Sequence, residues 1–163
     1  MKIVFKKSIL VLISILLLIN LSCQKDELNL KGETDYIIFG SEYRFCSDNC
    51  SIVYLLRSDG LYKSTEYLKT WKINSFNEKL DDTKFKQVMG LEGKIPLELL
   101  NEEEYEKTFG CPDCIDQGGY FLEIARKGSP NKRFRIDTFT NVLPEYVKKI
   151  AAEIKASIEI AKK

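Results

Sequence analysis

The sequence predicts a single small α+β domain, built on a mostly antiparallel sheet with a short middle helix and a long C-terminal amphipathic helix. Short runs of β-branched and aromatic residues, separated by turn residues, predict the strands. A capping residue before a helical pattern predicts the middle helix, and an apolar stripe after Pro144 predicts the last one.

The first half of the domain contains the patterns of several strands. Residues 36–39 begin the first, and strand character continues to residue 45. Residues 52–56 form the second strand, and the turn signal at 58–60 leads into a third strand at 61–62, which makes a hairpin. Residues 67–73 are a further extended segment. None of these strands alternates cleanly, which favours burial on much of both faces.

The middle of the chain predicts helical segments and a polar connection. Asp81 is a suitable N-cap for a short helix, and Gly90 is placed to end it. Residues 96–100 predict one further helical turn that begins with proline. Residues 101–107, which include three consecutive glutamates, predict an exposed acidic connection.

The last third predicts a hairpin followed by the long helix. Residues 120–126 form a strand, 127–131 a turn, and 133–137 a strand that alternates, with Phe134 and Ile136 toward the core and the intervening arginines toward water. After Pro144, apolar side chains recur at helical spacing over about five turns. These are Tyr146, Val147, Ile150, Ala151, Ile154, Ile158 and Ala161.

The N-terminus has the layout of a secretory signal. Three lysines at positions 2, 6 and 7 precede an apolar run over residues 9–19, and a small residue, Ser22, precedes Cys23. This run is shorter than the roughly 20 apolar residues that a spanning helix needs. We therefore expect cleavage before Cys23, with residues 1–22 removed.

Ser22 and Cys23 resemble the lipobox of bacterial lipoproteins, and the following Gln-Lys-Asp-Glu resembles the export tag of Bacteroidetes surface lipoproteins. The resemblance implies that Cys23 is acylated and holds the protein at the outer membrane, facing the cell exterior. The alternative is that these polar residues are a solvated spacer on a periplasm-facing anchor. Residues 23–34 then form the lipidated cysteine with a flexible tether, and residues 35–163 form the domain.

Charge and composition exclude several function classes. Removing residues 1–22 takes away three of the 25 basic residues and none of the 24 acidic ones, so the formal charge becomes about −2. This balance argues against a nucleic-acid partner. The chain contains no histidine, which excludes Ser-His-Asp triads, Cys-His nucleophiles and histidine-ligated metal sites.

Four cysteines remain after Cys23, in two close pairs: Cys46 with Cys50, and Cys111 with Cys114. An even number in an oxidising compartment favours two disulfides, and three connectivities are open. Local pairing is favoured because each pair flanks turn-forming residues. A four-cysteine zinc site has suitable spacing but requires thiols that stay reduced outside the cell.

Cys111-Pro-Asp-Cys114 also resembles glutaredoxin-type redox sites. In such sites the first thiolate lies at a helix N-terminus, which lowers its pKa. Here two glycines and a strand pattern follow instead, so a structural bridge is favoured over a catalytic one.

The stretch 109–119 resembles the GCPDC-x-D-x-G-G segment of small uncharacterised Bacteroidetes surface lipoproteins. The resemblance implies a secreted, disulfide-bearing α+β domain and supplies no activity. Physically, we expect Gly118 and Gly119 to permit positive φ and Asp116 to cap the turn. A calcium site on Asp113 and Asp116 is the weaker alternative, because regularly spaced oxygen ligands are missing.

Eight tyrosines and Trp71 raise the alternative of a sugar- or peptide-binding face, although packing in strands explains tyrosines as well. The lipid anchor, the absence of histidine and the cysteines suited to structural bridges together favour a non-enzymatic binding, inhibitory or accessory module with no catalytic residue, metal or cofactor. Its partners are the bilayer, through acylated Cys23, and a protein or glycan ligand. The alternative is an enzyme of the cell envelope, either a carboxylate-based glycosidase or a thiol oxidoreductase.

Overall fold

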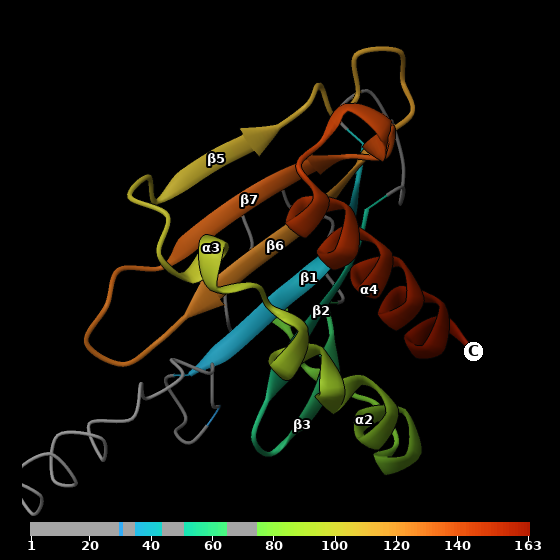
Figure 1. Ribbon diagram of the computed structural model, residues 1–163. Coiled ribbons are helices and arrows are strands. Elements are labelled where there is room, and N and C mark those ends of the chain that lie inside the picture. Colours follow the sequence, from blue (N-terminus) through green and yellow to red (C-terminus); the bar gives the residue numbers. More distant parts are fainter. Residues whose placement is uncertain (1–29, 31–34, 44–50, 65–74) are drawn as a thin grey trace, which may run out of the picture.

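The computed structural model describes residues 30, 35–43, 51–64 and 75–163 (Figure 1). These residues form a single small α+β domain around one mixed sheet of seven strands. The strands are β1 Tyr36–Glu42, β2 Ile52–Arg57, β3 Gly60–Lys63, β4 Glu78–Lys79, β5 Glu106–Phe109, β6 Gly119–Ala125 and β7 Lys132–Asp137.

The strand order is β4-β3-β2-β1-β6-β7-β5, and every neighbouring pair is antiparallel except β5 and β7. β1 therefore lies in the middle of the sheet, between its two hairpins. It pairs with β6 along its whole length, from Tyr36 opposite Ala125 to Glu42 opposite Gly119. This register defines two ends of the sheet, a Tyr36 end and a Gly119 end.

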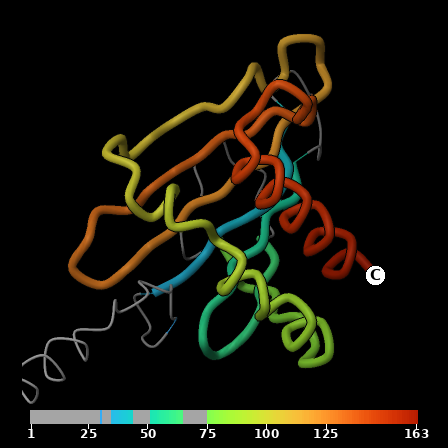
Figure 2. The backbone as a smooth tube through the Cα atoms, in the orientation of Figure 1, coloured from blue at the N-terminus to red at the C-terminus, as the bar shows by residue number. Residues whose placement is uncertain are grey.

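The helices lie on one face of the sheet (Figures 1 and 2). They are α2 Asp82–Val88, the 3₁₀ helix η2 Met89–Lys94, α3 Leu97–Leu100, the 3₁₀ helix η3 Thr140–Val142 and α4 Glu145–Lys162. Asp81 caps α2, because its carboxylate accepts hydrogen bonds from the backbone amides of Thr83 and Lys84, both at 3.0 Å. Within the described part of the chain, no helix has the length and apolar character needed to span a membrane.

The main core lies between these helices and the sheet. The apolar stripe of α4 covers β1, β6 and β7 through residues such as Val147, Ile150 and Ile154, each fully buried. Six of the seven predicted stripe residues are buried, and the seventh, Tyr146, packs partly buried at its edge. The predicted long amphipathic helix is therefore confirmed.

A second apolar cluster occupies the other face of β1, β2 and β6. It contains Ile38, Val53, Leu55, Phe76 and Phe121, all at most 6% exposed. Apolar side chains on both faces explain why the central strands lack clean alternation, as the sequence indicated.

Several boundaries differ from the sequence prediction, and β6, for example, begins and ends one residue earlier than expected. β1 ends at Glu42, whereas the sequence predicted strand character up to residue 45. Residues 44 and 45 lie outside the described part of the chain. Gly90 does not end the middle helix, because Met89 is its C-cap and Gly90 lies inside η2. Pro96 is the N-cap of α3, one position before the helix that it was expected to begin.

The largest difference is in the segment predicted as an exposed acidic connection. Its end forms β5, which pairs in parallel with β7, so that Glu106 lies opposite Arg133 and Phe109 opposite Ile136. Phe109 is buried in the main core, and its burial stabilises a strand that is otherwise polar. The segment 67–73, predicted to be extended, lies wholly outside the residues that the structure describes.

Leu30 belongs to the stretch predicted as a flexible tether. Its side chain is 7% exposed within the main core, and its backbone N–H donates to the Glu92 carboxylate at 2.6 Å. This residue is therefore held against the domain.

Candidate functional site

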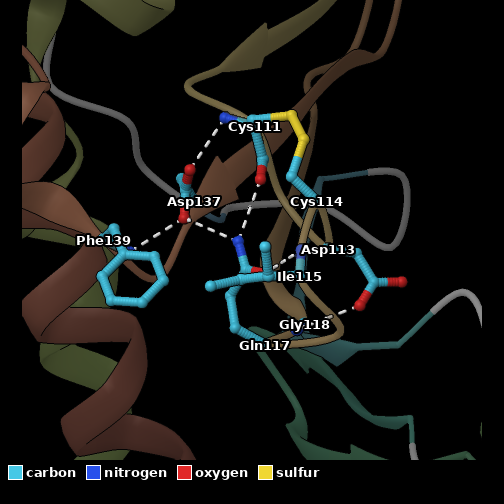
Figure 3. Close-up of a disulfide and its surroundings, with 8 residues drawn as sticks. All are labelled: Cys111, Asp113, Cys114, Ile115, Gln117, Gly118, Asp137 and Phe139. Atoms are coloured by element: carbon cyan, nitrogen blue, oxygen red, sulfur yellow. Dashed lines mark hydrogen bonds between the residues drawn. A yellow bond between two sulfur atoms is a disulfide. The ribbon is translucent and has the colours of Figure 1, made fainter.

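The residues that the sequence singled out around Cys111 lie together in the loop between β5 and β6 (Figure 3). Cys111 and Cys114 are joined by a disulfide, and the amide of Cys114 donates to the carbonyl of Cys111 at 3.3 Å. Local pairing is thus confirmed for this pair. Cys23, Cys46 and Cys50 lie outside the described residues, so their chemistry stays a prediction.

Asp137, the last residue of β7, holds this loop in place (Figure 3). One carboxylate oxygen accepts a hydrogen bond from the amide of Cys111 at 2.8 Å. The other accepts from the amide of Phe139 at 2.8 Å and from the side-chain amide of Gln117 at 3.3 Å. Asp137 therefore ties together the loops before β6 and after β7.

The pKa of Asp137 reflects these contacts. Burial by itself raises the pKa of this carboxyl, which is only 6% exposed. Hydrogen bonds from the amides of Phe139 and Cys111 and from Gln117 outweigh burial, so the pKa lies below its ordinary value. The carboxylate is ionised at neutral pH and serves as an acceptor of hydrogen bonds.

Two further side chains bond the loop to itself. Gln117 accepts a hydrogen bond from the amide of Ile115 at 2.8 Å and donates one to the carbonyl of Cys111 at 3.0 Å. Asp113, 7% exposed, accepts from the amide of Gly118 at 3.1 Å. The loop shape is therefore set by side-chain hydrogen bonds as well as by the disulfide.

The predicted turn residues have distinct roles. Gly118 has φ 70°, as expected, and a Cβ there would strike the ring of Tyr43. Gly119 does not have positive φ. It is required because a Cβ would lie 2.6 Å from Cβ of Pro112. Asp116 is exposed with φ 58°. The amide of Gly118 donates its hydrogen bond to Asp113, which the sequence had suggested only as a calcium ligand.

A small hollow of about 130 Å³ opens beside the disulfide. Its walls are Thr108, Gly110, Cys111, Pro112 and Arg135. Arg135 lies between two core-facing residues of β7, so it points to the sheet face opposite the helices. Its guanidinium is 3.2 Å from the Glu42 carboxylate, and its side chain remains 34% exposed.

Apolar side chains are exposed at the same end of the domain. Ile115, next to Cys114, is 71% exposed, and Phe139, whose amide binds Asp137, is 56% exposed. Val142 in η3 is 85% exposed. Large apolar side chains on a hydrogen-bonded loop are a common basis for partner binding.

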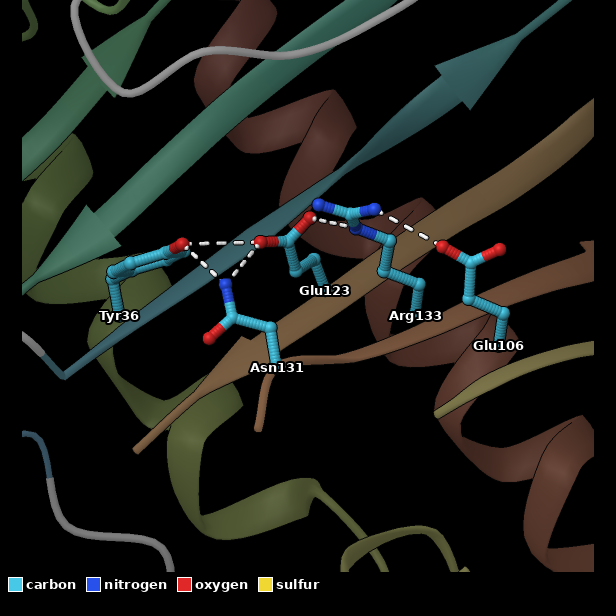
Figure 4. Close-up of polar contacts among 5 residues, drawn as sticks. All are labelled: Tyr36, Glu106, Glu123, Asn131 and Arg133. Carbon is cyan, nitrogen blue, oxygen red and sulfur yellow. Dashed lines mark hydrogen bonds and ion pairs between the residues drawn. The ribbon is translucent and has the colours of Figure 1, made fainter. Parts of the chain in front are cut away.

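A second polar cluster lies at the Tyr36 end of the sheet (Figure 4). Glu123 on β6, 3% exposed, accepts hydrogen bonds from Tyr36 at 3.0 Å, Asn131 at 2.9 Å and Arg133 at 2.7 Å. Arg133 also contacts Glu106 at 3.0 Å. Burial, together with the nearby Glu123, raises the pKa of Tyr36 to about 12.

This second cluster was not predicted, although a signal existed. Glu123 interrupts an apolar strand, and Arg133 faces it directly in the predicted hairpin. Since Tyr36, Glu123, Arg133 and Glu106 lie on the neighbouring strands β1, β6, β7 and β5, their contacts help to fix the register of the sheet. We assign this cluster a structural role.

The tyrosines do not gather on one face in the described part of the chain. Tyr54 is 1% exposed, and most of the others pack against one of the two apolar clusters. Tyr43 and Tyr105 are more exposed, at 42% and 55%. Tyr67 and Trp71 lie outside the described residues. The tyrosines of the described residues therefore do not form an aromatic binding face.

The described residues do not support the calcium and zinc sites that the sequence raised as alternatives. Among the described residues, no three side chains of cysteine, aspartate or glutamate gather as a metal site requires. The zinc alternative further needs free thiols at Cys111 and Cys114, which are joined to each other.

No protein-family model, curated protein or solved structure matches this chain. The geometry of the disulfide loop and the pattern of the N-terminal residues are therefore the guides to function.

Proposed function

We propose that this protein is a lipid-anchored module of the bacterial cell envelope, displayed on the outer face of the outer membrane. Residues 1–22 direct export and are removed, and acylated Cys23 holds the domain at the bilayer. The domain acts as a non-enzymatic binding, inhibitory or accessory module toward a protein or glycan. The N-terminal resemblance to Bacteroidetes surface lipoproteins carries the proposal.

The disulfide between Cys111 and Cys114 supports export. Disulfides persist in oxidising compartments and are rare in the reducing cytosol. Both cysteines are exposed, so a cytosolic pool of thiols would have ready access to the bridge. The observation supports an oxidising location and is neutral between the two faces of the outer membrane.

The Gly119 end of the sheet supports the binding role. Two exposed apolar side chains, Ile115 and Phe139, lie on loops that the disulfide and Asp137 hold in place, and a third, Val142, lies in the adjoining helix η3. An ordered apolar surface loses little conformational entropy when a partner covers it.

Metabolic labelling with a fatty acid tests the anchor. The wild-type chain should incorporate label, and Cys23→Ala should incorporate none, because no acyl chain can attach. A matched Cys46→Ser variant should be labelled like the wild type. Label that survives Cys23→Ala contradicts the lipobox assignment.

Protease treatment of intact cells tests the orientation separately. A surface-displayed domain should be digested, while a periplasmic control protein stays whole. A labelled domain that is fully protected from protease would keep the anchor and overturn surface display.

A further inference from the structure

Beyond the binding role proposed above, we propose that the Cys111–Cys114 disulfide is exchangeable and oxidises a pair of cysteines in a polypeptide partner, once per molecule and without catalytic turnover. The bridge closes a loop in which both cysteines are exposed, and Cys111 forms part of the wall of the 130 Å³ hollow. An incoming sulfur atom can therefore reach Cys111 without unfolding the domain.

The loop keeps its shape through contacts other than the bridge. Asp137 holds the amide of Cys111, Gln117 holds its carbonyl, and Asp113 holds the amide of Gly118. These hydrogen bonds can preserve the shape of the loop after the bridge is reduced.

Arg135 lines the hollow together with Cys111 and gives it a positive charge. The thiolate is the attacking form in disulfide exchange, and a neighbouring guanidinium attracts it. The Glu42 carboxylate at 3.2 Å offsets part of this charge, and the side chain of Arg135 stays 34% exposed. The negative charge of the nearby Asp137 is partly offset by the three hydrogen-bond donors that its oxygens bind. We therefore expect Arg135 to favour anionic partners modestly.

The size of the hollow selects the kind of partner. Pockets that enclose whole small ligands measure about 300–1,000 Å³. A hollow of about 130 Å³ admits one side chain such as cysteine. The exposed side chain of Ile115, which follows Cys114 in the chain, is available to contact the polypeptide that carries it.

The reaction exchanges one disulfide for another. A partner thiolate attacks Sγ of Cys111, the bond between the two sulfur atoms breaks, and Cys114 leaves as a thiolate that takes up a proton. The second partner thiolate attacks the partner sulfur of the mixed disulfide and releases Cys111 as a thiolate, which is protonated in turn. The partner loses two electrons and two protons, and Cys111 and Cys114 gain them.

The test uses the oxidised full chain and synthetic peptides that contain two cysteines, flanked either by aspartates or by lysines. After mixing in native buffer, free thiols are alkylated and the chain is cut with trypsin. Cleavage after Lys107 and Arg126 yields residues 108–126 with both cysteines, and Cys46 and Cys50 fall in 45–57. Alkylation of 108–126, in step with oxidation of the peptide, is the expected result.

The charge of the peptide reports on Arg135. We expect the acidic peptide to react roughly two- to fivefold faster than the basic one, as for an exposed ion pair, and high salt should remove the difference. Arg135→Gln should abolish the preference. Arg57→Gln, which removes one charge from the β2–β3 hairpin, should keep it.

Two outcomes overturn the proposal. One is a 108–126 fragment that stays unalkylated until denaturant is added, which would make the bridge a structural staple. The other is a preference that survives both Arg135→Gln and high salt, which would separate exchange from the hollow. If Arg135→Gln does not fold, the salt dependence of the wild-type chain decides the second point.

Discussion

Asp137 and Glu123 are buried carboxylates on adjacent strands, and they organise opposite ends of the same hairpin. Asp137 accepts two of its hydrogen bonds from backbone amides, those of Cys111 and Phe139. Glu123 accepts all of its described bonds from side chains, on β1, β7 and the turn between β6 and β7 (Figure 4).

This difference separates the two ends in function. A carboxylate that binds backbone amides sets the path of the chain and presents whatever side chains the loop carries. A carboxylate that binds side chains across strands sets the register and presents nothing further. The candidate site accordingly lies at the Asp137 end.

Asp137→Ala should have the largest effect on stability. It leaves the amides of Cys111 and Phe139 without their acceptor, and a buried unsatisfied group costs about 1–3 kcal/mol. We expect a loss of about 3 kcal/mol in the free energy of unfolding, measured by urea denaturation. Asp116→Asn is the control. It keeps an exposed residue tolerant of positive φ and should change stability by less than about 0.5 kcal/mol.

Glu123→Ala should cost less, about 2 kcal/mol, because its partners can turn to water. The side chain of Arg133 is already 48% exposed. Glu106→Ala removes the other carboxylate on Arg133, which is 73% exposed, and should cost less than about 0.5 kcal/mol. A larger loss for Glu123→Ala than for Asp137→Ala would reverse the comparison.

Replacing Cys111 and Cys114 together by serine should cost about 2 kcal/mol, the chain-entropy value for so short a loop. This is the lower end of the 2–4 kcal/mol expected for losing such a bridge. Thermal unfolding of the variant measures it. Because Asp137 still holds the loop, the amide of Cys111 or its serine replacement should remain protected from hydrogen exchange. Loss of that protection would show that the bridge, and not Asp137, sets the loop.

The contribution of Asp137 to stability should be lost at acid pH, and that of Tyr36, which binds Glu123, at alkaline pH. The folded pKa of Asp137 is lowered, so its contribution is present above the unfolded value near 3.8 and is lost as pH falls through the folded pKa. The folded pKa of Tyr36 is raised to about 12, so its contribution is lost as pH rises from about 10 to 12. Asp137→Asn should weaken the acid limb and leave the alkaline limb unchanged; Asp59 and Asp81, whose pKa values are also lowered, supply other parts of the acid limb. Tyr36→Phe should weaken the alkaline limb, of which Tyr54 supplies another part.

Local signals predicted the elements whose cause is local. Asp81 caps a helix through its own neighbours, and the stripe of α4 is visible in any helical projection. β5 could not be predicted in this way, because its partner β7 begins 26 residues later and its burial rests on Phe109 alone. Asp137 was expected at the end of a strand, yet its partners lie on two loops whose approach no local pattern encodes.

The two glycines of the loop also differ in whether a local signal could predict their role. The positive φ of Gly118 follows from turn composition and was predicted. The close approach of Pro112 to Gly119 depends on how the disulfide loop folds back over β6, which only the tertiary structure reveals.

The docking of Leu30 would give a lipid-anchored domain a defined orientation relative to the membrane. If Cys23 is acylated, only residues 24–29 separate the lipid from a residue fixed in the core, a span of about 25 Å when fully extended. The chain then enters the sheet at Tyr36, the end opposite Gly119 and the disulfide loop. An anchored molecule would therefore stand close to the bilayer on its Tyr36 end and turn Cys111, Cys114 and Ile115 outward, toward whatever diffuses past the cell.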